Sequence, residues 1–517
     1  MNASLHTAAF ISANLYKDSV ALMRVAQGLL ALPGVVNATL QMGNPANKDI
    51  LREAGLLHKA VQDAGPSDVM VVVQARSAAE CAAAVDSCQA QLAGTQASGA
   101  GAGEAQALPR TNLGMGHAAM PSANMAQISV PGPYAAAEAL KAIKLGMNVF
   151  LFSDNVPLAQ EASLKQEATR RGLLVMGPDC GTAIIGGVPL GFANAVRRGN
   201  IGLVAASGTG LQEVSTQIHR MGGGVSHAIG TGGRDVYEEV GGATMLQGIG
   251  LLAADPGTKV IAIVSKPPAP AVAERVLAAL KASGKPSVVL FLGATAQAPQ
   301  AGKGAALRIA HTLVDCAAMA VRLAGAKRQA PAHYPLPRKP VFAKSQKYLR
   351  ALYAGGTFTA EAQSLWAAAG LQVWSNVPLD PALALPHPRQ ASREHSALDL
   401  GDDAFTVGRP HPMIDQAARI ERLMMEAADP SVRVILLDVV IGWGAHSNPA
   451  AELASAIVQA KALARKRGRQ LAIVGFVCGT EADPQVLSQQ EALLRKAGMV
   501  LAGNSANAAW LAGQWLR

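Results

Sequence analysis

The sequence predicts a multidomain α/β fold with parallel sheets and a small N-terminal α/β domain. Apolar runs of strand length alternate with helical patterns along most of the chain. Polar, glycine-rich turns join many of these strands to the helix that follows, as in right-handed parallel sheets. The 517 residues are enough for several domains. Half of the residues are hydrophobic and 4% are aromatic, a composition that suits helices packed closely on sheets.

The small N-terminal domain is predicted at residues 1–92, where three strands alternate with helices. The expected strands are Ala8–Ile11, Val35–Met42 and Asp68–Gln74, and the expected helices include Ser19–Leu32 and Ser77–Leu92. This order fits either a ferredoxin-like sandwich or a short open sheet. The segment 43–48 is interpreted as a polar turn. Residues 93–108 are rich in Ala, Gly and Ser, which predicts a flexible linker.

Three further α/β domains are predicted at 109–197, 198–325 and 349–517, with a Pro- and Lys/Arg-rich linker at 326–348. Ligands of parallel sheets lie beyond the carboxyl ends of the strands, where polar turns stand in each domain. The strands expected in the first domain are Met125–Val130, Asn148–Phe152 and Leu173–Met176. Those expected in the other two are Ile201–Ala206, Val225–Ile229, Val260–Val264, Ser287–Leu292, Val432–Ile441, Leu471–Val477 and Met499–Ala502.

The formal charge of +10 is spread along the chain. The densest basic run, 465–469, ends a predicted helix, where cations complement the helix dipole, so we interpret it as a solvated helix end. No basic motif with interleaved aromatic residues indicates nucleic-acid binding. We expect a small phosphorylated or acidic substrate, and neither nucleic acid nor a membrane as partner.

The five cysteines are odd in number and include no C-x-x-C pair. This pattern predicts reduced thiols and neither disulfide bonds nor a zinc site, so no metal is expected. The N-terminus lacks a basic start followed by an apolar core, which argues against a signal peptide. No uninterrupted apolar run reaches the length of about 18 residues that suggests a membrane span. We therefore expect a cytoplasmic protein.

The strand Ile201–Ala206 leads through the turn Ser207-Gly208-Thr209-Gly210 into a helix at Leu211–Met221. The first turn of such a helix offers free backbone N–H groups and the positive end of the dipole, which suit an anion and above all phosphate. Ser207 and Thr209 can cap the helix and donate hydroxyls. An ordinary strand-to-helix turn also favours Gly and Ser, so the motif alone leaves both interpretations open.

A second glycine-rich turn near the C-terminus has the same design. The strand Val432–Ile441 leads through Gly442-Trp443-Gly444-Ala445-His446 to a helix. Asn448 is the predicted N-cap of this helix, with Pro449 at its first position. We expect the two helix N-termini, one at each turn, to face one phosphate.

Two arginines, Arg234 and Arg409, are the best candidates for binding an anionic substrate. Each lies in a polar loop after glycines, and a guanidinium group can grip a carboxylate or phosphate through two parallel hydrogen bonds. The alternative is an arginine that pairs with a neighbouring carboxylate, Asp235 or Asp415. The weaker candidates, interpreted mainly as exposed or structural side chains, are Lys266, His227 and His411.

The order of several motifs resembles a known family. GPDCG at 177–181, GLVAASGT at 202–209 and GTGG at 230–233 are similar to the α subunit of succinyl-CoA synthetase. LDLG at 398–401 and GWG at 442–444 are similar to the last domain of its β subunit. More closely, nearly the whole chain resembles the FdrA family. The phrases of that family present here are FSDNV, GLLVMGPDCGT, ASGTG, HAIG-x-GGRD, VSKPP, GRPHPMID and LLDVVIG.

The resemblance implies a succinyl-CoA synthetase-like fold. It would have a CoA-binding-like Rossmann domain at 109–197 and ligase-like, flavodoxin-type domains at 198–325 and 349–517. Succinyl-CoA synthetases carry a phosphorylated histidine in a GHAGA segment, but the corresponding stretch here, 293–305, has no histidine. His311 lies further on, within a helical pattern, and is interpreted as structural. Because no ATP-grasp domain is evident either, the resemblance does not imply the ligase reaction.

FdrA-like proteins are associated with purine and allantoin breakdown, as one subunit of an oxamate carbamoyltransferase. That complex interconverts oxalurate plus phosphate with oxamate plus carbamoyl phosphate. The resemblance thus implies a carbamoyltransferase that needs no cofactor, takes a small ureide or amide and works with companion subunits in a hetero-oligomer. The residues expected to be catalytic are Thr209, Arg234 and His446. Those expected to bind substrate or phosphate are Ser207, Gly208, Gly210, Gly232, Gly233, Arg409, Gly442, Gly444 and Ala445.

Two alternatives stay open. One is an acyl-CoA synthetase subunit of the succinyl-CoA synthetase type, which uses CoA, needs a phosphorylated residue and relies on a nucleotide domain on another chain. The other is a scaffold without catalytic activity that binds a phosphorylated metabolite. The scaffold predicts that the activity of the complex is unimpaired when Thr209 and Gly444 are both altered.

Overall fold

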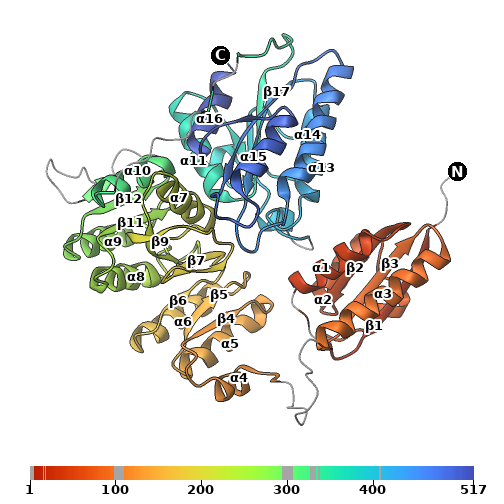
Figure 1. Cartoon of the computed structure of the whole chain (residues 1–517), viewed down its shortest axis with the longest axis horizontal. Helices are drawn as coiled ribbons and strands as arrows, with labels where there is room; N and C mark the ends of the chain where they lie inside the picture. Colours follow the sequence, from red (N-terminus) through yellow and green to blue (C-terminus); the bar gives the residue numbers. More distant parts are fainter. Residues whose placement is uncertain are drawn as a thin grey trace. The chain divides into compact units, whose positions relative to one another are not determined.

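The computed structural model describes residues 5–15, 17, 19–97, 110–293, 307–326, 334–335, 338–406 and 409–516. The chain divides into two compact units, Met1–Thr111 and Asn112–Arg517 (Figure 1). Most of the predicted linker 93–108, part of the linker 326–348 and most of the segment 293–305 lie outside the described residues.

The first unit is built on an antiparallel sheet of three strands, with β3 in the middle and paired to both neighbours. This pairing is of the ferredoxin-like kind. Helices α1 and α3 pack on one face of the sheet, and α3 runs into the range predicted as a linker. The elements are β1 (His6–Ser12), α1 (Ser19–Leu30), β2 (Val35–Met42), β3 (Val69–Ala75) and α3 (Ala78–Ala97).

The other face of this sheet packs against α2 (Pro45–Glu53) and the short 3-10 helix η1 (Lys59–Val61). The predicted polar turn at 43–48 is therefore wrong. Asn44 is the N-cap of α2, and its side chain accepts a hydrogen bond from the N–H of Asn47 at 2.8 Å. An Asn followed by a Pro is a helix start signal, and here it decides the local structure.

The second unit begins with α4 (Leu113–Ala119) and a parallel sheet of three short strands. The helices α5 and α6 follow the first two strands and pack against each other. The three strands predicted in this region are present. The elements are β4 (Met125–Ile128), α5 (Gly132–Lys144), β5 (Asn148–Leu151), α6 (Leu158–Arg170) and β6 (Val175–Met176).

Next in the chain comes a seven-stranded sheet with the order β13-β12-β11-β9-β10-β7-β8. Its first five strands are parallel, whereas β7 and β8 form an antiparallel hairpin on β10 that the sequence did not predict. The strands are β7 (Thr182–Ile185), β8 (Val188–Gly191), β9 (Arg198–Ala205), β10 (Val225–Gly230), β11 (Val260–Ser265), β12 (Ser287–Phe291) and β13 (Leu307–Ile309). The helices are α7 (Gly208–Arg220), α8 (Ala243–Ala254), α9 (Pro270–Ala282) and α10 (Leu313–Leu323).

The last sheet has six parallel strands in the order β15-β16-β14-β17-β18-β19. The strands are β14 (Tyr348–Tyr353), β15 (Trp374–Ser375), β16 (Ser396–Asp399), β17 (Val432–Val440), β18 (Ala472–Cys478) and β19 (Val500–Leu501). The helices are α11 (Gly356–Ala368), the 3-10 helix η2 (Pro381–Leu383), α12 (Asp403–Thr406), α13 (Ala417–Ala428), α14 (Pro449–Lys466), α15 (Leu487–Lys496) and α16 (Ser505–Gln514). These parallel sheets confirm the predicted α/β fold class.

Both large sheets carry the first of their parallel strands in the middle. β9 lies between β11 and β10, and β14 lies between β17 and β16. The chain leaves β9 into α7 and leaves β14 into α11, so both helices begin where the strand order reverses. Open α/β sheets bind ligands in the crevice beyond the carboxyl ends of the strands at such switch points.

One hydrophobic core joins the two large sheets. It contains Leu211 and Val214 of α7, Phe358 and Trp366 of α11, and strand residues from both sheets. α7 buries polar side chains as well, among them Glu213, because it lies between the sheets and has little solvent-facing surface. The pair of helices α7 and α11 therefore stands at the centre of the second unit.

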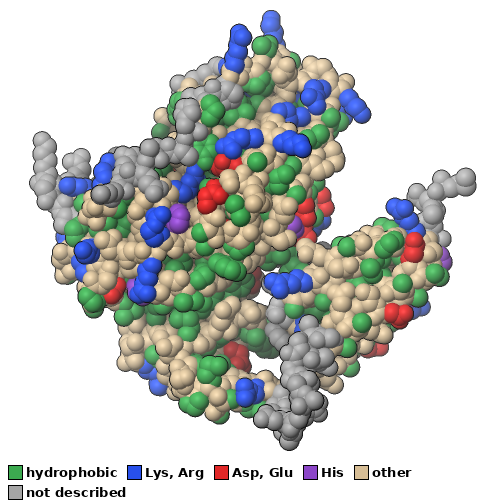
Figure 2. Space-filling model, in the orientation of Figure 1, with side chains coloured by type: hydrophobic (Ala, Val, Ile, Leu, Met, Phe, Trp, Pro, Cys, Tyr) green, Lys and Arg blue, Asp and Glu red, His purple; other side chains and the backbone are tan. Residues whose placement is uncertain are grey.

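Two general features of the molecule are the charged side chains of one face and the apolar character of the helices. Figure 2 shows Lys and Arg side chains scattered over the visible face without one dominant patch. Among the helices that the structure describes, none combines the length and the apolar character that crossing a lipid bilayer would require.

Candidate functional site

The first turns of α7 and α11 lie against each other. The hydroxyl oxygens of Ser207 and Thr357 share a hydrogen bond. A Cβ added to Gly355 would overlap the side chain of Thr209. Since Ser207 and Gly355 are the N-cap residues, each threonine touches the N-cap of the opposite helix. We call residues 207–210 and 355–358 together the cradle.

The cradle presents backbone donors that have no partner. The Oγ of Ser207 accepts a hydrogen bond from the N–H of Gly210 at 2.9 Å, whereas Gly355 has no side chain to cap α11. Within the described part of the chain, the N–H groups of 356–358 and of Gly208 and Thr209 donate to no acceptor. Two helix dipoles also direct their positive ends here. This combination suits an anion such as phosphate.

A carboxylate and an ammonium group converge on the start of α11. A Cβ added to Gly356 would lie 2.8 Å from Oδ2 of Asp399 and 3.1 Å from Nζ of Lys266. Oδ1 of Asp399 accepts the N–H of Gly401 at 2.9 Å. Asp399 is 7% exposed, and burial raises its pKa to about 7 although Lys266 acts in the opposite direction. Asp399 therefore changes its charge near neutral pH, beside the cradle.

His411 packs beneath the loop that follows Asp399. Its ring centroid lies 5.7 Å from that of Phe192, and its Nδ1 accepts the N–H of Met413 at 3.2 Å, which places the hydrogen on Nε2. Burial, together with Arg419, lowers the pKa of His411 to about 4. The imidazole is therefore neutral near pH 7.

The glycine turn before α14 has other neighbours. The N–H of Gly442 donates to Oε1 of Gln485 at 3.0 Å, and the N–H of Trp443 donates to the carbonyl of Ala193 at 2.8 Å. Gly442 and Gly444 have φ of 125° and 78°, and both approach the segment 191–193 too closely for a Cβ. The predicted pairing of this turn with the Ser207 turn is therefore replaced by the pairing of α7 with α11.

His446 is held by the start of its own helix. Its Nδ1 accepts the N–H of Asn448 at 3.0 Å, and its Nε2 lies 3.2 Å from Oε1 of Glu452. The hydrogen bond with Glu452 raises the pKa of His446. Asn448 occupies the predicted N-cap position before Pro449, but its side chain makes no capping bond. The roles expected of His446 and its neighbour Ala445 stay predictions.

Arg234 belongs to a cluster of ion pairs between α6 and the loop after β10. Its guanidinium lies 2.9 Å from Glu161 and donates to the carbonyl of Val156 at 2.7 Å. Lys165 bridges Glu161 and Asp235 at 2.9 and 2.8 Å, with all three side chains at most 1% exposed. The alternative pairing of Arg234 with Asp235 is therefore wrong, because Lys165 pairs with this carboxylate.

The remaining predicted ligands lie in two loops. Gly232, with φ of 79°, approaches the carbonyl of Pro178 too closely for a Cβ, whereas Gly233 has no atom within 4 Å of that position. Arg409 is half exposed and pairs with Glu421 at 2.7 Å, so the expected pairing with the aspartate of its own loop is wrong. Among the described residues, neither arginine contacts the cradle.

His227, a weaker candidate, and His311, interpreted as structural, differ in their surroundings. His227 accepts the N–H of Gly186 at 3.0 Å. His311 is exposed and precedes Thr312, which caps α10 by accepting the N–H of Asp315 at 3.1 Å. The predicted helical position of His311 is therefore wrong, because the cap places the start of the helix after it.

Four residues at this site were not predicted from the sequence: Gly355, Gly356, Thr357 and Asp399. A signal was present, because Ala-Ser-Gly-Thr at 206–209 and Ala-Gly-Gly-Thr at 354–357 both follow an apolar strand with the same spacing. The turn at 354–357 lacks a capping side chain at its second position. It therefore resembled a phosphate turn less than the Gly442 turn did.

A second group of free donors lies at the carboxyl edge of the small parallel sheet. α5 and α6 begin after Pro131 and Pro157, and neither start has a side-chain cap. In α5, however, Pro133 has no N–H and the N–H of Tyr134 donates to the carbonyl of Pro131 at 2.9 Å, so the start of α6 offers more free N–H groups. The Oγ of Ser153, just after β5, is buried without a hydrogen-bond partner among the described residues. The uncapped start of α6 and the free hydroxyl fit the pyrophosphate of a nucleotide-type cofactor, whereas the carbonyl oxygens of Asp154 and Asn155 lie against Gly132 at the start of α5.

Three protein-family models match the chain. A model described as CoA-ligase matches residues 352–515, and one described as CoA binding domain matches 196–293. The third, described as AllF, heavy metal-associated domain, matches 5–109. Among the described residues, no group of three or more His, Cys, Asp or Glu side chains is placed to hold a metal ion. The CoA-binding match falls within the range expected to be ligase-like, so the domain labels stay a prediction.

Similar proteins include one that matches over nearly the full length. The Escherichia coli (strain K12) protein YahF is 43% identical over 513 residues, which are 98% of each chain. The α subunit of the ADP-forming succinate–CoA ligase of Methanothermobacter thermautotrophicus is 29% identical over 34% of this chain and 58% of that subunit. A solved acetyl-coenzyme A synthetase of Ca. Korarchaeum cryptofilum is 15% identical, with 76% of this chain and 82% of that chain covered and a TM-score of 0.32.

These matches correct the expected enzyme class. Two of the family models and the partial-length relative are of the CoA-ligase or CoA-binding type. The expectation of a carbamoyltransferase is therefore wrong, and its oxamate and allantoin context is without support. CoA, which the sequence analysis kept only for the alternative, is the cofactor to which the matches point.

Proposed function

The chain belongs to the FdrA-like family of succinyl-CoA synthetase-like proteins, and from this premise we propose that it is a CoA-ligase-type subunit that transfers an acyl group between phosphate and CoA. In this proposal the cradle binds the phosphate. Companion subunits in a hetero-oligomer stay a prediction.

The observation that carries the proposal is the meeting of two helix N-termini at the hydrogen bond between Ser207 and Thr357. A single N-terminus would be explained by an ordinary turn. Two such ends in contact place like partial charges side by side, which is unfavourable without an anion between or beside them. The free N–H groups of 356–358 add donors at the same place.

The expected reaction follows from the charges of the cradle. An acyl phosphate reacts by cleavage of the bond between its acyl carbon and the bridging oxygen, and the electron pair of that bond stays on the departing phosphate. Donors of both helices are placed to stabilise this growing charge. Asp399, with a pKa of about 7, is able to accept a proton beside the cradle. Direct transfer of this kind requires no phosphorylated histidine.

CoA would supply the thiol that takes the acyl group. The residues that fit its pyrophosphate are the uncapped start of α6 and the free hydroxyl of Ser153, which precede the range matched by the CoA-binding model. The match of the CoA-binding model supports the use of this cofactor. In this proposal the chain binds CoA, orients it and holds the phosphate.

The test compares two threonines of α11. Thr357→Val removes the hydroxyl that joins the two helices, whereas Thr359→Val is the matched control, because its hydroxyl bonds only the carbonyl of Gly355 in its own helix. We expect the first variant to bind inorganic phosphate about tenfold more weakly by calorimetry. The control should stay within about twofold.

The reaction is tested with acyl phosphates and CoA, by following the loss of free thiol. Wild-type protein with its companion subunits should consume thiol in proportion to the acyl phosphate added, and Thr357→Val should slow this reaction. Equal phosphate affinity in the two threonine variants would remove the cradle from the proposal. Phosphate binding without any thiol consumption would leave a binding protein and contradict the enzymatic function.

A further inference from the structure

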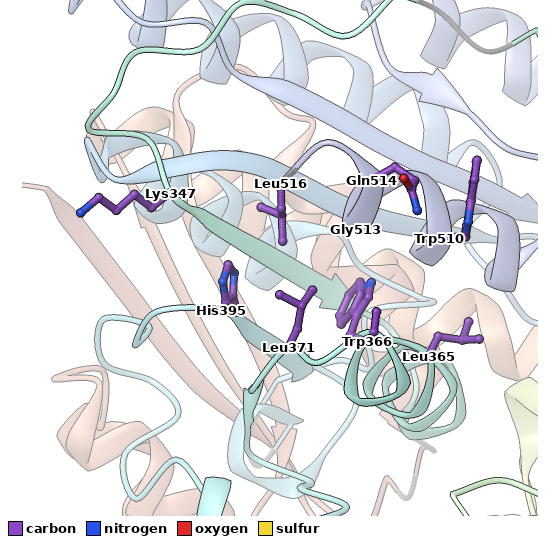
Figure 3. Close-up of a pocket in the computed structure, with 10 residues that line it drawn as sticks. Lys347, Leu365, Trp366, Leu371, His395, Trp510, Gly513, Gln514 and Leu516 are labelled. Atoms are coloured by element: carbon purple, nitrogen blue, oxygen red, sulfur yellow. The ribbon is translucent and has the colours of Figure 1, made fainter.

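A pocket of about 260 Å³ lies at the other end of α11, remote from the cradle along the helix. It is bounded by the last turns of α11 and α16 and by the residues just before β14 and β16 (Figure 3). Since all strands of this sheet are parallel, the pocket lies at their amino ends and the cradle at their carboxyl ends. The two are separate sites.

The pocket has an aromatic end. Figure 3 shows Trp366 and Trp510 at one end, with Leu371 and Leu516 between them and the opposite end. Trp366 is fixed and forms the floor of this end, because its Nε1 donates to the carbonyl of Ala509 at 2.8 Å and the residue is 1% exposed. Trp510 is 51% exposed, so its ring offers apolar surface at the opening. This end suits an aromatic ring.

The opposite end offers hydrogen-bond donors. His395 and the base of the Lys347 side chain stand there in Figure 3, in which the ammonium of Lys347 points away from the other lining residues. The Nδ1 of His395 accepts the N–H of Leu349 at 3.2 Å, which places its hydrogen on Nε2 as a donor. Burial and Arg350 lower the pKa of His395, so the ring is neutral near pH 7. None of the ten residues that line the pocket is acidic. The polar end therefore favours an acceptor, and the ammonium of Lys347, once its flexible side chain turns inward, favours an anionic one.

We propose that this pocket binds a small aromatic carboxylate, with the ring against Trp510 and the neighbouring leucines and the carboxylate at His395 and Lys347. The volume is somewhat below the roughly 300–1,000 Å³ of sites for drug-sized ligands. A single ring with a short acidic chain fits this size. The charge pattern selects the acid over its neutral amide, because only the acid complements the ammonium group.

The experiment titrates the full chain with 3-phenylpropanoate and with the uncharged 3-phenylpropanamide, by calorimetry. We expect the acid to bind with a stoichiometry of one and the amide to bind at least about tenfold more weakly. Lys347→Gln should weaken the acid about tenfold and leave the amide unchanged. Lys344→Gln is the matched control, because Lys344 is an exposed lysine three residues earlier that does not line the pocket.

Two further measurements make the proposal falsifiable. Trp510→Ala should weaken both probes, since it removes apolar surface from the aromatic end, and circular dichroism of each variant checks the fold. Inorganic phosphate should not displace the acid, because the pocket and the cradle are separate. Absence of saturable binding, equal affinities for acid and amide, or displacement by phosphate would each overturn the proposal. None of these results bears on the function proposed for the cradle.

Discussion

The first turns of α7 and α11 align position by position and share a Gly-Thr pair, yet their capping differs. Ser207 corresponds to Gly355 and Thr209 to Thr357. Ser207 caps its own helix and also bonds Thr357, whereas Gly355 caps nothing and makes room for Thr209. One serine thus serves both helices. The turn without a cap keeps its backbone donors free.

This difference gives the two similar turns different roles at one site: one fixes the geometry and the other leaves N–H donors free. A side chain at 355 would satisfy one N–H group of α11, but it would also push the helices apart. Glycine keeps the contact and leaves the donors to a ligand. In α7 the serine fixes the turn, so its geometry does not depend on a bound anion.

The largest effect is expected from Gly355→Ala. The new Cβ would overlap Thr209, so the two first turns must separate. Overpacking of this kind costs about 1–3 kcal/mol, and the affinity for phosphate should fall with it. Gly250→Ala is the control, because nothing lies within 4 Å of its Cβ position in α8. Urea unfolding midpoints and phosphate calorimetry measure both effects. Unchanged stability of Gly355→Ala would show that the helices can move apart freely.

The next comparison is between Gly356→Ala and Gly208→Ala, which occupy equivalent positions. A Cβ at 356 would lie 2.8 Å from Asp399 and 3.1 Å from Lys266, whereas a Cβ at 208 has its nearest neighbour, Thr182, at an ordinary 3.5 Å. We expect phosphate affinity to fall about tenfold in the first variant and about twofold or less in the second. If both lose affinity equally, the asymmetry between the two turns is not functional.

The two turns also show which parts of the site could be predicted from the sequence. The strand before α7 and the turn Ser207–Gly210 were predicted, because an apolar run followed by a capping serine is a local signal. The same holds for β17, β18 and β19, whereas β14, β15 and β16 were not predicted as strands. The partner of that turn could not be predicted from local pattern. The pairing of the Ser207 turn with the start of α11 depends on how the two sheets pack. Because the residues of α7 buried between the sheets include polar ones, they give no apolar pattern that would predict this packing.

The errors have physical causes of the same kind. Asp399 follows an apolar strand as many aspartates do, and only burial beside Lys266 gives it a pKa of about 7. The glycines at 442 and 444 were interpreted as part of a phosphate-binding turn. In the structure they adopt positive φ and allow the turn to pack closely against the segment 191–193. A glycine needed for packing and one needed for a ligand look alike in a sequence.

A pH series sharpens the role of Asp399. Burial raises its pKa from 3.8 to about 7, so the carboxyl is neutral well below pH 7 and anionic above it. An anion in the cradle should therefore bind less tightly as pH rises from 6 to 8, by roughly fivefold. Sulfate is the suitable probe, because its own charge does not change in this range. Asp399→Asn should flatten the profile. A variant with the wild-type slope would assign the titration to another group.

The smallest effect is expected from His446→Gln. His446 lies in the glycine turn before α14, which is not part of the cradle. His446 pairs with Glu452, and their side chains are 16% and 46% exposed, respectively. The pKa of His446 is raised and that of Glu452 is lowered by their mutual hydrogen bond. The pair therefore stabilises the fold above the acid range of Glu452, and most fully below pH 6.5. This contribution is lost as pH rises through the folded pKa of His446. Because the pair is partly exposed, the loss should be about 0.3–1 kcal/mol.

This loss of stability should appear in unfolding midpoints near pH 5.5 and vanish above pH 8, while phosphate affinity stays within about twofold of wild type. A large drop in phosphate affinity would instead show that the glycine turn before α14 belongs to the phosphate site. The site would then include the start of α14 beside those of α7 and α11.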